Sequence, residues 1–370
     1  MSTTSSTPRV PPVSPILPRP VAAQADLLWT DEGVSGVCHN QLTGQLAHRV
    51  ARAFATHIIE HNQDARRTIL VAGDGRPLTV ELVAATAESI QWCGCDVIEL
   101  SDASSGGLTL AIHKFQAHGG VLIGNGPSES HTASLTFFAA GGKPLSCDGC
   151  LGQIKTRSDR GHARPVRSAG NLTRGSIDAE YGAAFQNYLG FQRISRIVID
   201  SASGPLMRWL KQLLPAGCQL IRPQTYPMVA ASSAKPSKPG PTFRQHREKM
   251  IARQIIADAA EFGIWIDGNG EACTVIDDRG LPIAPQTLVT LLAKCPTDES
   301  DEIVTFVENK TRESTYLQLS AGNTTLATDS QGRIWHRTAD GAYQLDALYV
   351  LARLFAMLKL TGRPLRKLLG

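Results

Sequence analysis

Two cysteines stand at the spacing that zinc sites and redox pairs use, in Cys147-Asp-Gly-Cys150. A structural zinc ion needs four ligands, commonly two such pairs or one pair with two histidines. No second pair and no nearby histidine stands at that spacing. The pair therefore does not predict a metal or redox centre, and the eight cysteines are expected to be reduced thiols of a cytoplasmic protein.

Two short turns carry carboxylates at the ends of apolar runs. Asp267-Gly-Asn-Gly follows the apolar residues 262–266, and glycine and asparagine are the residues that accept a positive φ. This pattern predicts a hairpin turn between strands at 262–266 and 272–277. The turn at 73–77 carries Asp74 and Arg76, which are expected to form a structural pair closing it.

Periodicity places these turns between strands and helices. Apolar residues at helical spacing predict helices, and short β-branched runs predict strands. The expected helices span residues 46–60, 81–92, 108–116, 205–214, 243–261 and 343–360. The expected strands span residues 68–72, 95–100, 118–123, 196–200, 219–222, 262–266 and 302–308. Because strands and helices alternate in three successive sets, we expect crossover units on parallel sheets in three related α/β domains.

Composition agrees with a folded multidomain protein. The 370 residues are 42% hydrophobic and 19% charged, with a net charge of +4. No apolar run is long enough for a membrane helix, and no dense basic stripe suggests nucleic acid, so neither partner is expected. Residues 1–25 are rich in Ser, Thr and Pro and predict a disordered leader without a secretory signal.

Five segments, in order, resemble the α-D-phosphohexomutase family of phosphoglucomutases and phosphomannomutases. They are WTDEGVSG at 29–36, VAGDGRP at 71–77, the glycine-flanked loop at 119–145, FGIWIDGNGEACTVIDDRGLPI at 262–283 and the helical segment at 338–369. The resemblance implies repeated αβα sandwich domains at 26–165, 166–285 and 286–370, with the third domain shortened and the family's fourth domain absent.

That family transfers phosphate through a phosphoserine, and the resemblance locates the corresponding loop within residues 119–137. An ungapped match puts Gly126 at the serine position and Pro127 at the position of the histidine beside it. A match shifted by four residues instead puts Ser130 and His131 there, at the cost of an insertion and a deletion. The ungapped match implies that phosphoryl transfer through this position is lost, because glycine has no side chain.

The resemblance also assigns a metal loop at 267–271, where the family has three aspartates that bind Mg²⁺. Here the three positions are Asp267, Asn269 and Glu271. Asparagine offers a neutral oxygen and glutamate places its carboxylate one methylene further out, whereas Mg²⁺ demands a tight octahedron of short oxygen ligands. No cofactor is therefore expected, or Mg²⁺ if the protein is active.

The cationic groups that the family uses on phosphate are reduced. Ser35, Gly73 and Thr136 stand where the family has two arginines and a lysine. Arg76, Asp329 and Arg333 remain as candidate contacts to a sugar phosphate, Arg76 as a remnant phosphate contact beside its structural role. The segment that contains Asp329 and Arg333 also fits a plain turn between two strands.

Two functions fit this pattern. The first is a pseudoenzyme: a phosphohexomutase-like relative that binds a hexose phosphate or a partner without catalysis. The second is an active phosphoglucomutase or phosphomannomutase, an isomerase of carbohydrate metabolism that uses Ser130 and a relaxed metal site. The wide apolar stripe of the C-terminal helix further predicts a homo-oligomer or a protein partner on the C-terminal domain; it comprises Leu345, Leu348, Leu351, Leu354, Phe355 and Leu358.

Overall fold

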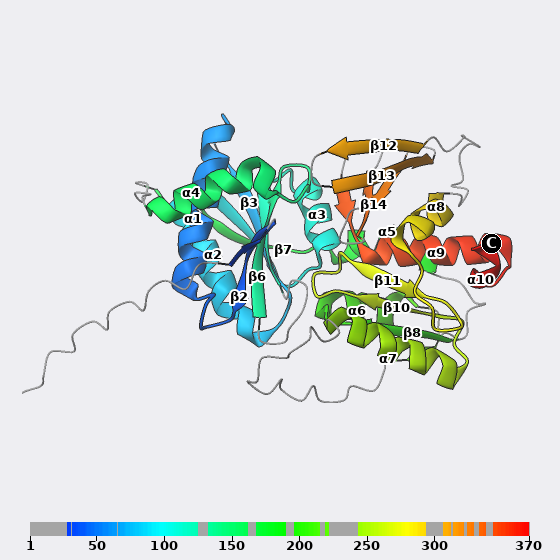
Figure 1. The fold of residues 1–370 in the computed structure, drawn as a ribbon. Coiled ribbons are helices and arrows are strands. Elements are labelled where there is room, and N and C mark those ends of the chain that lie inside the picture. Colours follow the sequence, from blue (N-terminus) through cyan, green and yellow to red (C-terminus); the bar gives the residue numbers. More distant parts are fainter. Residues whose placement is uncertain are drawn as a thin grey trace, which may run out of the picture.

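Three β-sheets follow one another along the chain (Figure 1). The computed structural model describes residues 28–30, 32–64, 66–124, 132–161, 168–189, 196–214, 219–221, 243–293, 306–311, 314–321, 324–328, 333–337 and 343–369. The leader predicted at residues 1–25 lies outside them.

The first sheet has seven strands in the order β1-β2-β6-β5-β3-β4-β7. Its strands are β1 (Leu28–Thr30), β2 (Gly33–Val37), β3 (Thr68–Gly73), β4 (Asp96–Leu100), β5 (Gly119–Gly124), β6 (Thr132–Ala139) and β7 (Leu172–Gly175). Strands β5, β3, β4 and β7 run parallel, and β6, β2 and β1 complete the sheet antiparallel. The apolar runs of β3 and β5 are buried almost throughout, as central strands of a parallel sheet require. Because β7 pairs with β4, the sheet continues past the boundary predicted at residue 165.

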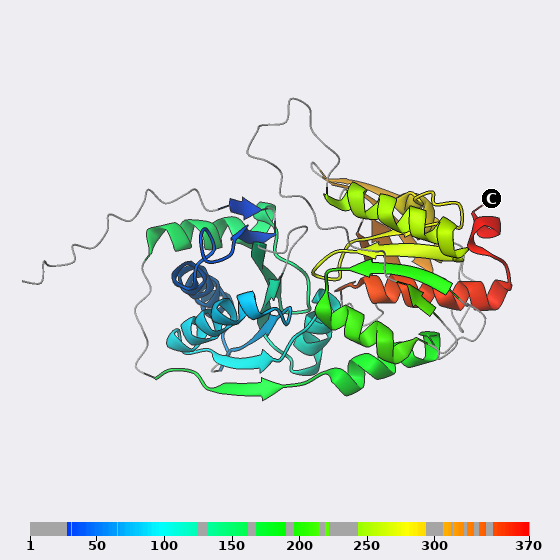
Figure 2. The ribbon, with the colours of Figure 1, turned by 90° about the horizontal axis from the view of Figure 1, so that it is seen from below.

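Helices cover both faces of this sheet (Figure 2). They are α1 (Gly44–His61), α2 (Val80–Trp92), α3 (Ser105–Lys114) and α4 (Gly152–Arg160), with short helical turns at Pro77–Thr79 and Cys147–Leu151. The next helix, α5 (Asp178–Leu189), packs instead against helices that follow it in the chain. The apolar faces of α1, α2 and α4 share a core with one face of the sheet. Helix α3 packs on the opposite face, in a core that continues into the rest of the molecule. The sandwich predicted from strand–helix alternation is therefore confirmed.

The second sheet has the order β11-β10-β8-β9. It consists of β8 (Arg196–Ser201), β9 (Gln219–Ile221), β10 (Phe262–Ile266) and β11 (Cys273–Ile276), with the helices α6 (Gly204–Leu213) and α7 (Phe243–Asp258). Strand β8 runs parallel to β9 and β10, and β11 is antiparallel to β10. Helix α7 ends three residues before the predicted position 261, and Ala259 then adopts a φ of 48°.

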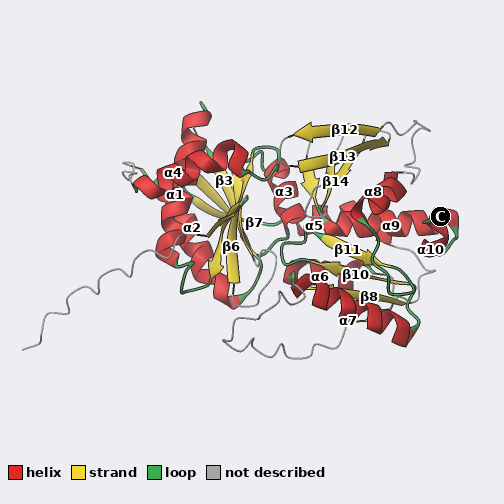
Figure 3. Ribbon diagram, viewed as in Figure 1, coloured by secondary structure: helices red, strands yellow, loops and turns green. Residues whose placement is uncertain are grey.

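The third sheet differs from the expected crossover units because all its strand pairs are antiparallel (Figure 3). It contains β12 (Phe306–Thr311), β13 (Ser314–Ala321), β14 (Thr324–Thr328), β15 (Ile334–Arg337) and β16 (Tyr343–Leu345). Two residues separate β12 from β13, and two separate β13 from β14. Such connections suit hairpins, whereas a parallel crossover needs a dozen residues or more.

The C-terminal helix lies between the second and third sheets (Figure 1). The helices of this part are α8 (Pro285–Ala293), α9 (Ala347–Thr361) and α10 (Leu365–Leu368). The predicted helix start at residue 343 is wrong, because Tyr343–Leu345 pairs with β15 as strand β16. On α9, Phe355 meets Phe262 of the second sheet, and Tyr349 stacks on His336 of the third.

The apolar stripe of the C-terminal helix is buried inside the chain. The exposed fractions are 2% or less for Leu345, Leu348, Leu351, Leu354 and Phe355, and 7% for Leu358. The exposed apolar surface on which the predicted partner rested is therefore absent from α9. Among the described helices, none is long and apolar enough to span a membrane.

Candidate functional site

The loop between β10 and β11 closes a hairpin. The Asp267 N–H donates to the carbonyl oxygen of Ala272 at 3.0 Å, and the strands on either side pair antiparallel. Gly270 has a φ of 77°. The predicted hairpin turn is confirmed, although Asn269 does not share the positive φ expected of it, so glycine alone supplies the left-handed position.

This loop, residues 267–271, lies where three parts of the chain meet. The Ser105 N–H at the start of α3 donates to the Asn269 carbonyl at 2.9 Å. The Ala347 N–H at the start of α9 donates to the Gly270 carbonyl at 2.8 Å. The end of β5 also approaches, since a methyl group on Gly124 would lie 2.4 Å from Asn269 Oδ1. The loop therefore joins these three parts of the chain and is enclosed by them.

The side chains of the predicted metal ligands are buried and occupied by protein partners. Asp267, Asn269 and Glu271 are 8%, 6% and 4% exposed. Asp267 Oδ1 accepts the Glu271 N–H at 2.7 Å, inside the loop itself. Glu271 Oε1 accepts the Ser105 hydroxyl at 2.6 Å, and its Oε2 lies 3.5 Å from Arg333 Nη1. The two carboxylates thus serve separate structural contacts.

Burial governs the protonation of both carboxylates. It raises the pKa of Asp267, against the opposing effect of the backbone N–H groups of the loop. It raises the pKa of Glu271 as well, while the charge of Arg333 lowers it. A fixed positive charge is therefore what favours the ionised form of Glu271 here.

Arg333 supplies that charge, and it also reaches the first domain. Its backbone forms a β-bridge with Ala272, which anchors the residue beside the loop. Its guanidinium donates to Glu32, between β1 and β2, and approaches Glu271. The ring of Trp335 lies 5.4 Å from the guanidinium carbon. Arg333 was predicted to contact substrate, but the structure uses its charge between two carboxylates, and it is 9% exposed.

Three helices begin around the loop, and their N-termini favour negative charge nearby. Ser104, Ser203 and Asp346 are the N-cap residues of α3, α6 and α9. Asp346 accepts the Leu348 N–H at 2.8 Å and the Tyr181 hydroxyl at 2.7 Å. Burial raises the pKa of Asp346 to about 6.

The remaining candidates separate into two groups. Arg76 donates from Nε to Asp74 Oδ2 at 2.5 Å, and Thr79 donates to Asp74 Oδ1 at 2.9 Å. The structural pair predicted for this turn is confirmed. Four residues of the phosphoserine-type loop, Gly126, Pro127, Ser130 and His131, lie outside the described residues, as does Asp329.

Sequence reasoning missed Glu32, Ser105 and Asp346. Ser105 and Asp346 carried a local signal, because a Ser-Ser pair or an aspartate directly before an apolar helix is typical of a helix N-terminus. Glu32 and Arg333 are 301 positions apart, and nothing in either neighbourhood indicates the pairing.

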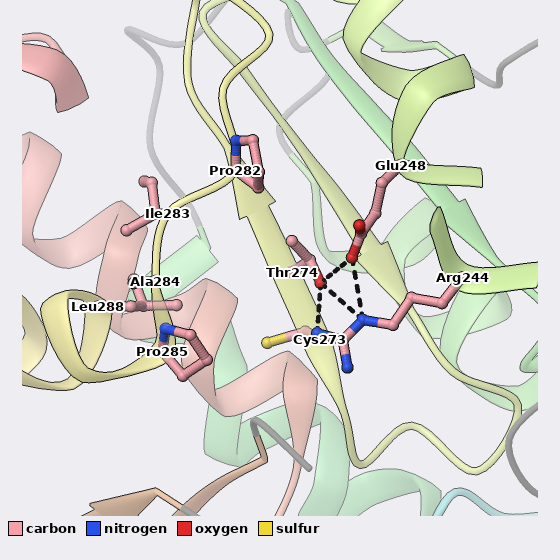
Figure 4. A pocket seen from close by; sticks show the side chains of 9 residues that line it. All are labelled: Arg244, Glu248, Cys273, Thr274, Pro282, Ile283, Ala284, Pro285 and Leu288. Atoms are coloured by element: carbon pink, nitrogen blue, oxygen red, sulfur yellow. Dashed lines mark hydrogen bonds and ion pairs between the residues drawn. The ribbon is translucent and has the colours of Figure 1, made fainter. Parts of the chain in front are cut away.

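A pocket of about 340 Å³ lies away from the loop, between α7, β11 and the start of α8 (Figure 4). Arg244 and Glu248 stand on one side and Pro282, Ile283 and Leu288 on the other. Arg244 donates to Glu248 at 2.9 Å, and the Thr274 hydroxyl lies between them. The two charged side chains that line this pocket, Arg244 and Glu248, therefore pair with each other.

Three sheets with helices packed around them meet at an acidic hairpin loop, so the chain is an α/β protein. The family profile described as phosphoglucomutase/phosphomannomutase, alpha/beta/alpha domain I, matches residues 27–155. A phosphomannomutase of Vibrio cholerae is 23% identical over 70% of this chain and 57% of its own length. A phosphoglucosamine mutase of Staphylococcus haemolyticus is 25% identical over 91% of this chain and 79% of its own length.

Solved structures agree with this fold. A putative phosphomannomutase from Thermus thermophilus superposes with a TM-score of 0.64 at 15% identity, over 93% of this chain and 83% of the other. A phosphoglucomutase/phosphomannomutase family protein from Burkholderia thailandensis gives 0.64 at 17% identity, over 91% and 78%. Residues 27–155 thus match the phosphoglucomutase/phosphomannomutase family, and the chain as a whole has the fold of these solved structures. It spans less than three fifths of the length of the first curated relatives it matches.

The loop residues of this chain do not fit Mg²⁺. The ion requires several oxygens at about 2.0–2.1 Å around one centre. Here one carboxylate is bonded to its own loop and the other to Ser105 and Arg333. Among the described residues, no three His, Cys, Asp or Glu side chains are grouped to hold a metal ion.

Proposed function

We propose that this chain is a non-catalytic member of the phosphohexomutase family that binds a hexose phosphate without isomerising it. The proposal rests mainly on the contacts of Glu271: its carboxylate accepts a hydrogen bond from Ser105 and pairs with Arg333. Phosphoryl transfer needs cationic groups and a metal ion around the migrating phosphoryl group. Here the loop carboxylates, Arg76 and Arg333 are all engaged in internal contacts.

The ligand class follows from the relatives. Those matched here are named as mutases of phosphomannose and phosphoglucosamine, and the chain shares their fold. A hexose phosphate is therefore the ligand that this scaffold is expected to accept. The second candidate, an active mutase using Ser130, gains no support from the geometry of the loop.

A coupled mutase assay tests the proposal. The full chain is incubated with glucose, mannose or glucosamine 1-phosphate, Mg²⁺ and a bisphosphate activator, beside the Staphylococcus haemolyticus phosphoglucosamine mutase as positive control. We expect a rate at least about 10⁴-fold below that control, because losing one stabilising group alone costs about 10²–10³ in such reactions. Calorimetry with the same sugar phosphates measures binding separately. A Mg²⁺-dependent rate near that of the control, abolished in Ser130→Ala, would establish the active alternative.

A further inference from the structure

The pocket between α7, β11 and the start of α8 has one charged wall and one apolar wall (Figure 4). Arg244 and Glu248 form the charged wall. The apolar wall opposite consists of Pro282, Ile283, Ala284, Pro285 and Leu288. The volume of about 340 Å³ lies in the range of pockets that hold small molecules. Since no lining residue belongs to the 267–271 loop, this pocket is a candidate ligand site separate from that loop.

The side chains of the charged wall are held in place by their neighbours. Arg244 donates from Nε to Glu248 Oε1 at 2.9 Å and from Nη2 to the Thr274 hydroxyl at 2.7 Å. That hydroxyl donates in turn to Glu248 Oε1 at 2.6 Å. The guanidinium carbon of Arg244 lies 5.2 Å from the centroid of the Trp265 ring. Arg244 and Glu248 are still 33% and 19% exposed, so a fixed positive group and a fixed negative group stand side by side within reach of a ligand.

The apolar wall is attached to β11 through the backbone. The Ile283 N–H donates to the Val275 carbonyl at 2.8 Å, and Pro282 forms a β-bridge with Ile276. Leu288, in the first turn of α8, is 2% exposed. Because both walls are held by regular structure, a ligand would find the pocket already formed, which lowers the entropic cost of binding.

The two walls together select a small zwitterion with a hydrocarbon body. The described contacts of Glu248 all fall on Oε1, which leaves Oε2 as the acceptor for a ligand ammonium group. A guanidinium has five N–H donors, so Arg244 can bind a ligand carboxylate while it keeps its contact with Glu248. A hydrocarbon chain placed against the apolar wall would be removed from water. An amino acid with an aliphatic side chain carries these three groups on one carbon atom.

We propose that this pocket binds a free α-amino acid with an aliphatic side chain. Arg244 binds its carboxylate, Glu248 binds its ammonium group, and the side chain lies against Ile283 and Leu288. The bound amino acid contacts both α7 and α8, and so joins the second sheet to the helix that follows it. This site is independent of the proposed binding of a hexose phosphate, because it uses other residues.

Calorimetry on the full chain with leucine and three analogues tests the proposal. Isocaproate lacks the ammonium group of leucine, isopentylamine lacks its carboxylate, and serine lacks its hydrocarbon side chain. We expect saturable binding of leucine in the millimolar range or below. Each analogue should bind at least about tenfold more weakly, because a hydrogen bond to a charged group or the burial of an aliphatic side chain contributes at least that much.

Two variants assign the ligand groups to the pocket. Arg244→Gln and Glu248→Gln should each weaken leucine binding at least about tenfold. Arg244→Gln should also lose the preference for leucine over isopentylamine, and Glu248→Gln the preference for leucine over isocaproate. Arg253→Gln is the matched control, because Arg253 is an exposed arginine of the same helix that does not line the pocket. It should bind leucine as the wild type does.

Three results would overturn the proposal: no leucine binding to the wild type, isocaproate or isopentylamine binding as tightly as leucine, or leucine binding that neither pocket variant weakens. The analogue series uses the wild type alone, so it decides the question even if a pocket variant does not fold. Mutase activity in the wild type would contradict the proposed function and leave this site untouched. A failure of leucine to bind would do the reverse.

Discussion

At Gly270 the backbone has a φ of 77°, and side chains from two other elements lie where a β-carbon would project. Ser104 Cβ and Leu206 Cδ1 are each 3.2 Å from that point. The residue thus combines a left-handed turn with close contact between domains. Only glycine meets both conditions without strain.

Replacing Gly270 by alanine should destabilise the protein by about 2–4 kcal/mol, through left-handed backbone strain together with crowding. Gly141→Ala is the matched control, since Gly141 has a φ of 83° but nothing within 4 Å of an added methyl. It should cost only the backbone part, about 1 kcal/mol. Urea unfolding of both variants measures the difference. Equal losses would show that the contacts around Gly270 relax freely.

At the scale of elements, α9 is the helix that ties the C-terminal part to the rest. It begins at the Asp346 cap and ends where Gly362 adopts a φ of 63°. Its faces contact both the second and the third sheet, which explains why the helix is apolar around most of its circumference. An all-round apolar helix in this chain indicates burial between two sheets, not an exposed interface.

Truncating Phe355 to alanine should lower the free energy of unfolding by about 3–5 kcal/mol, because the ring is 1% exposed and its cavity would lie between packed layers. The control is Leu360→Ala at the end of the same helix, where the side chain is 58% exposed. That change should cost no more than about 0.5 kcal/mol. Thermal and urea unfolding provide the comparison. Similar losses in the two variants would mean that α9 is not clamped between the sheets.

For the whole molecule, the junction of the domains is a buried acidic centre. Asp346 joins α9 to Tyr181 of α5, and the loop carboxylates contact Ser105 and Arg333. Helix N-termini and the Arg333 guanidinium are positive groups that lie beside these carboxylates. The stability of the assembled chain should therefore depend on pH through these acids.

Asp346 makes that dependence measurable. Its pKa rises from 3.8 to about 6 on burial. Because the folded protein holds this proton more tightly than the unfolded chain, the free energy of unfolding should fall as pH rises from about 4 to about 6. A shift of about 2 units corresponds to about 3 kcal/mol at most. Well above pH 6 the stabilisation that the protonated Asp346 contributes has been lost completely.

Asp346→Asn removes the titration and keeps an oxygen that can cap α9. Urea unfolding at pH 4.5 and pH 7 should show a smaller fall in the variant than in the wild type. The shifted pKa values of Asp267 and Glu271 act in both proteins, so the comparison isolates Asp346. Parallel pH profiles would argue that Asp346 titrates as an ordinary carboxyl.

Much of the local structure was determined by the sequence alone. The spacing of Leu46, Val50, Phe54 and Ile58 predicted α1, and the buried runs predicted β3, β5, β8 and β10. The Asp267-Gly-Asn-Gly turn and the Asp74–Arg76 pair were also predicted, because a turn and its capping pair depend on adjacent residues. The spacing of apolar residues and the residue types of a turn depend only on neighbouring positions, so both can be recognised in the sequence alone.

Tertiary structure decided the rest. The antiparallel third sheet depends on which strands pair, and the burial of the α9 stripe depends on two sheets packing against it. The partners of Glu271 come from α3 and from the residue before β15, far away in the chain. A buried charge pairs with an opposite charge that tertiary packing brings close to it. The residues next to it in the sequence therefore do not indicate which partner it has. The sequence therefore determined where the loop lies, while the folded chain determined what its carboxylates bind.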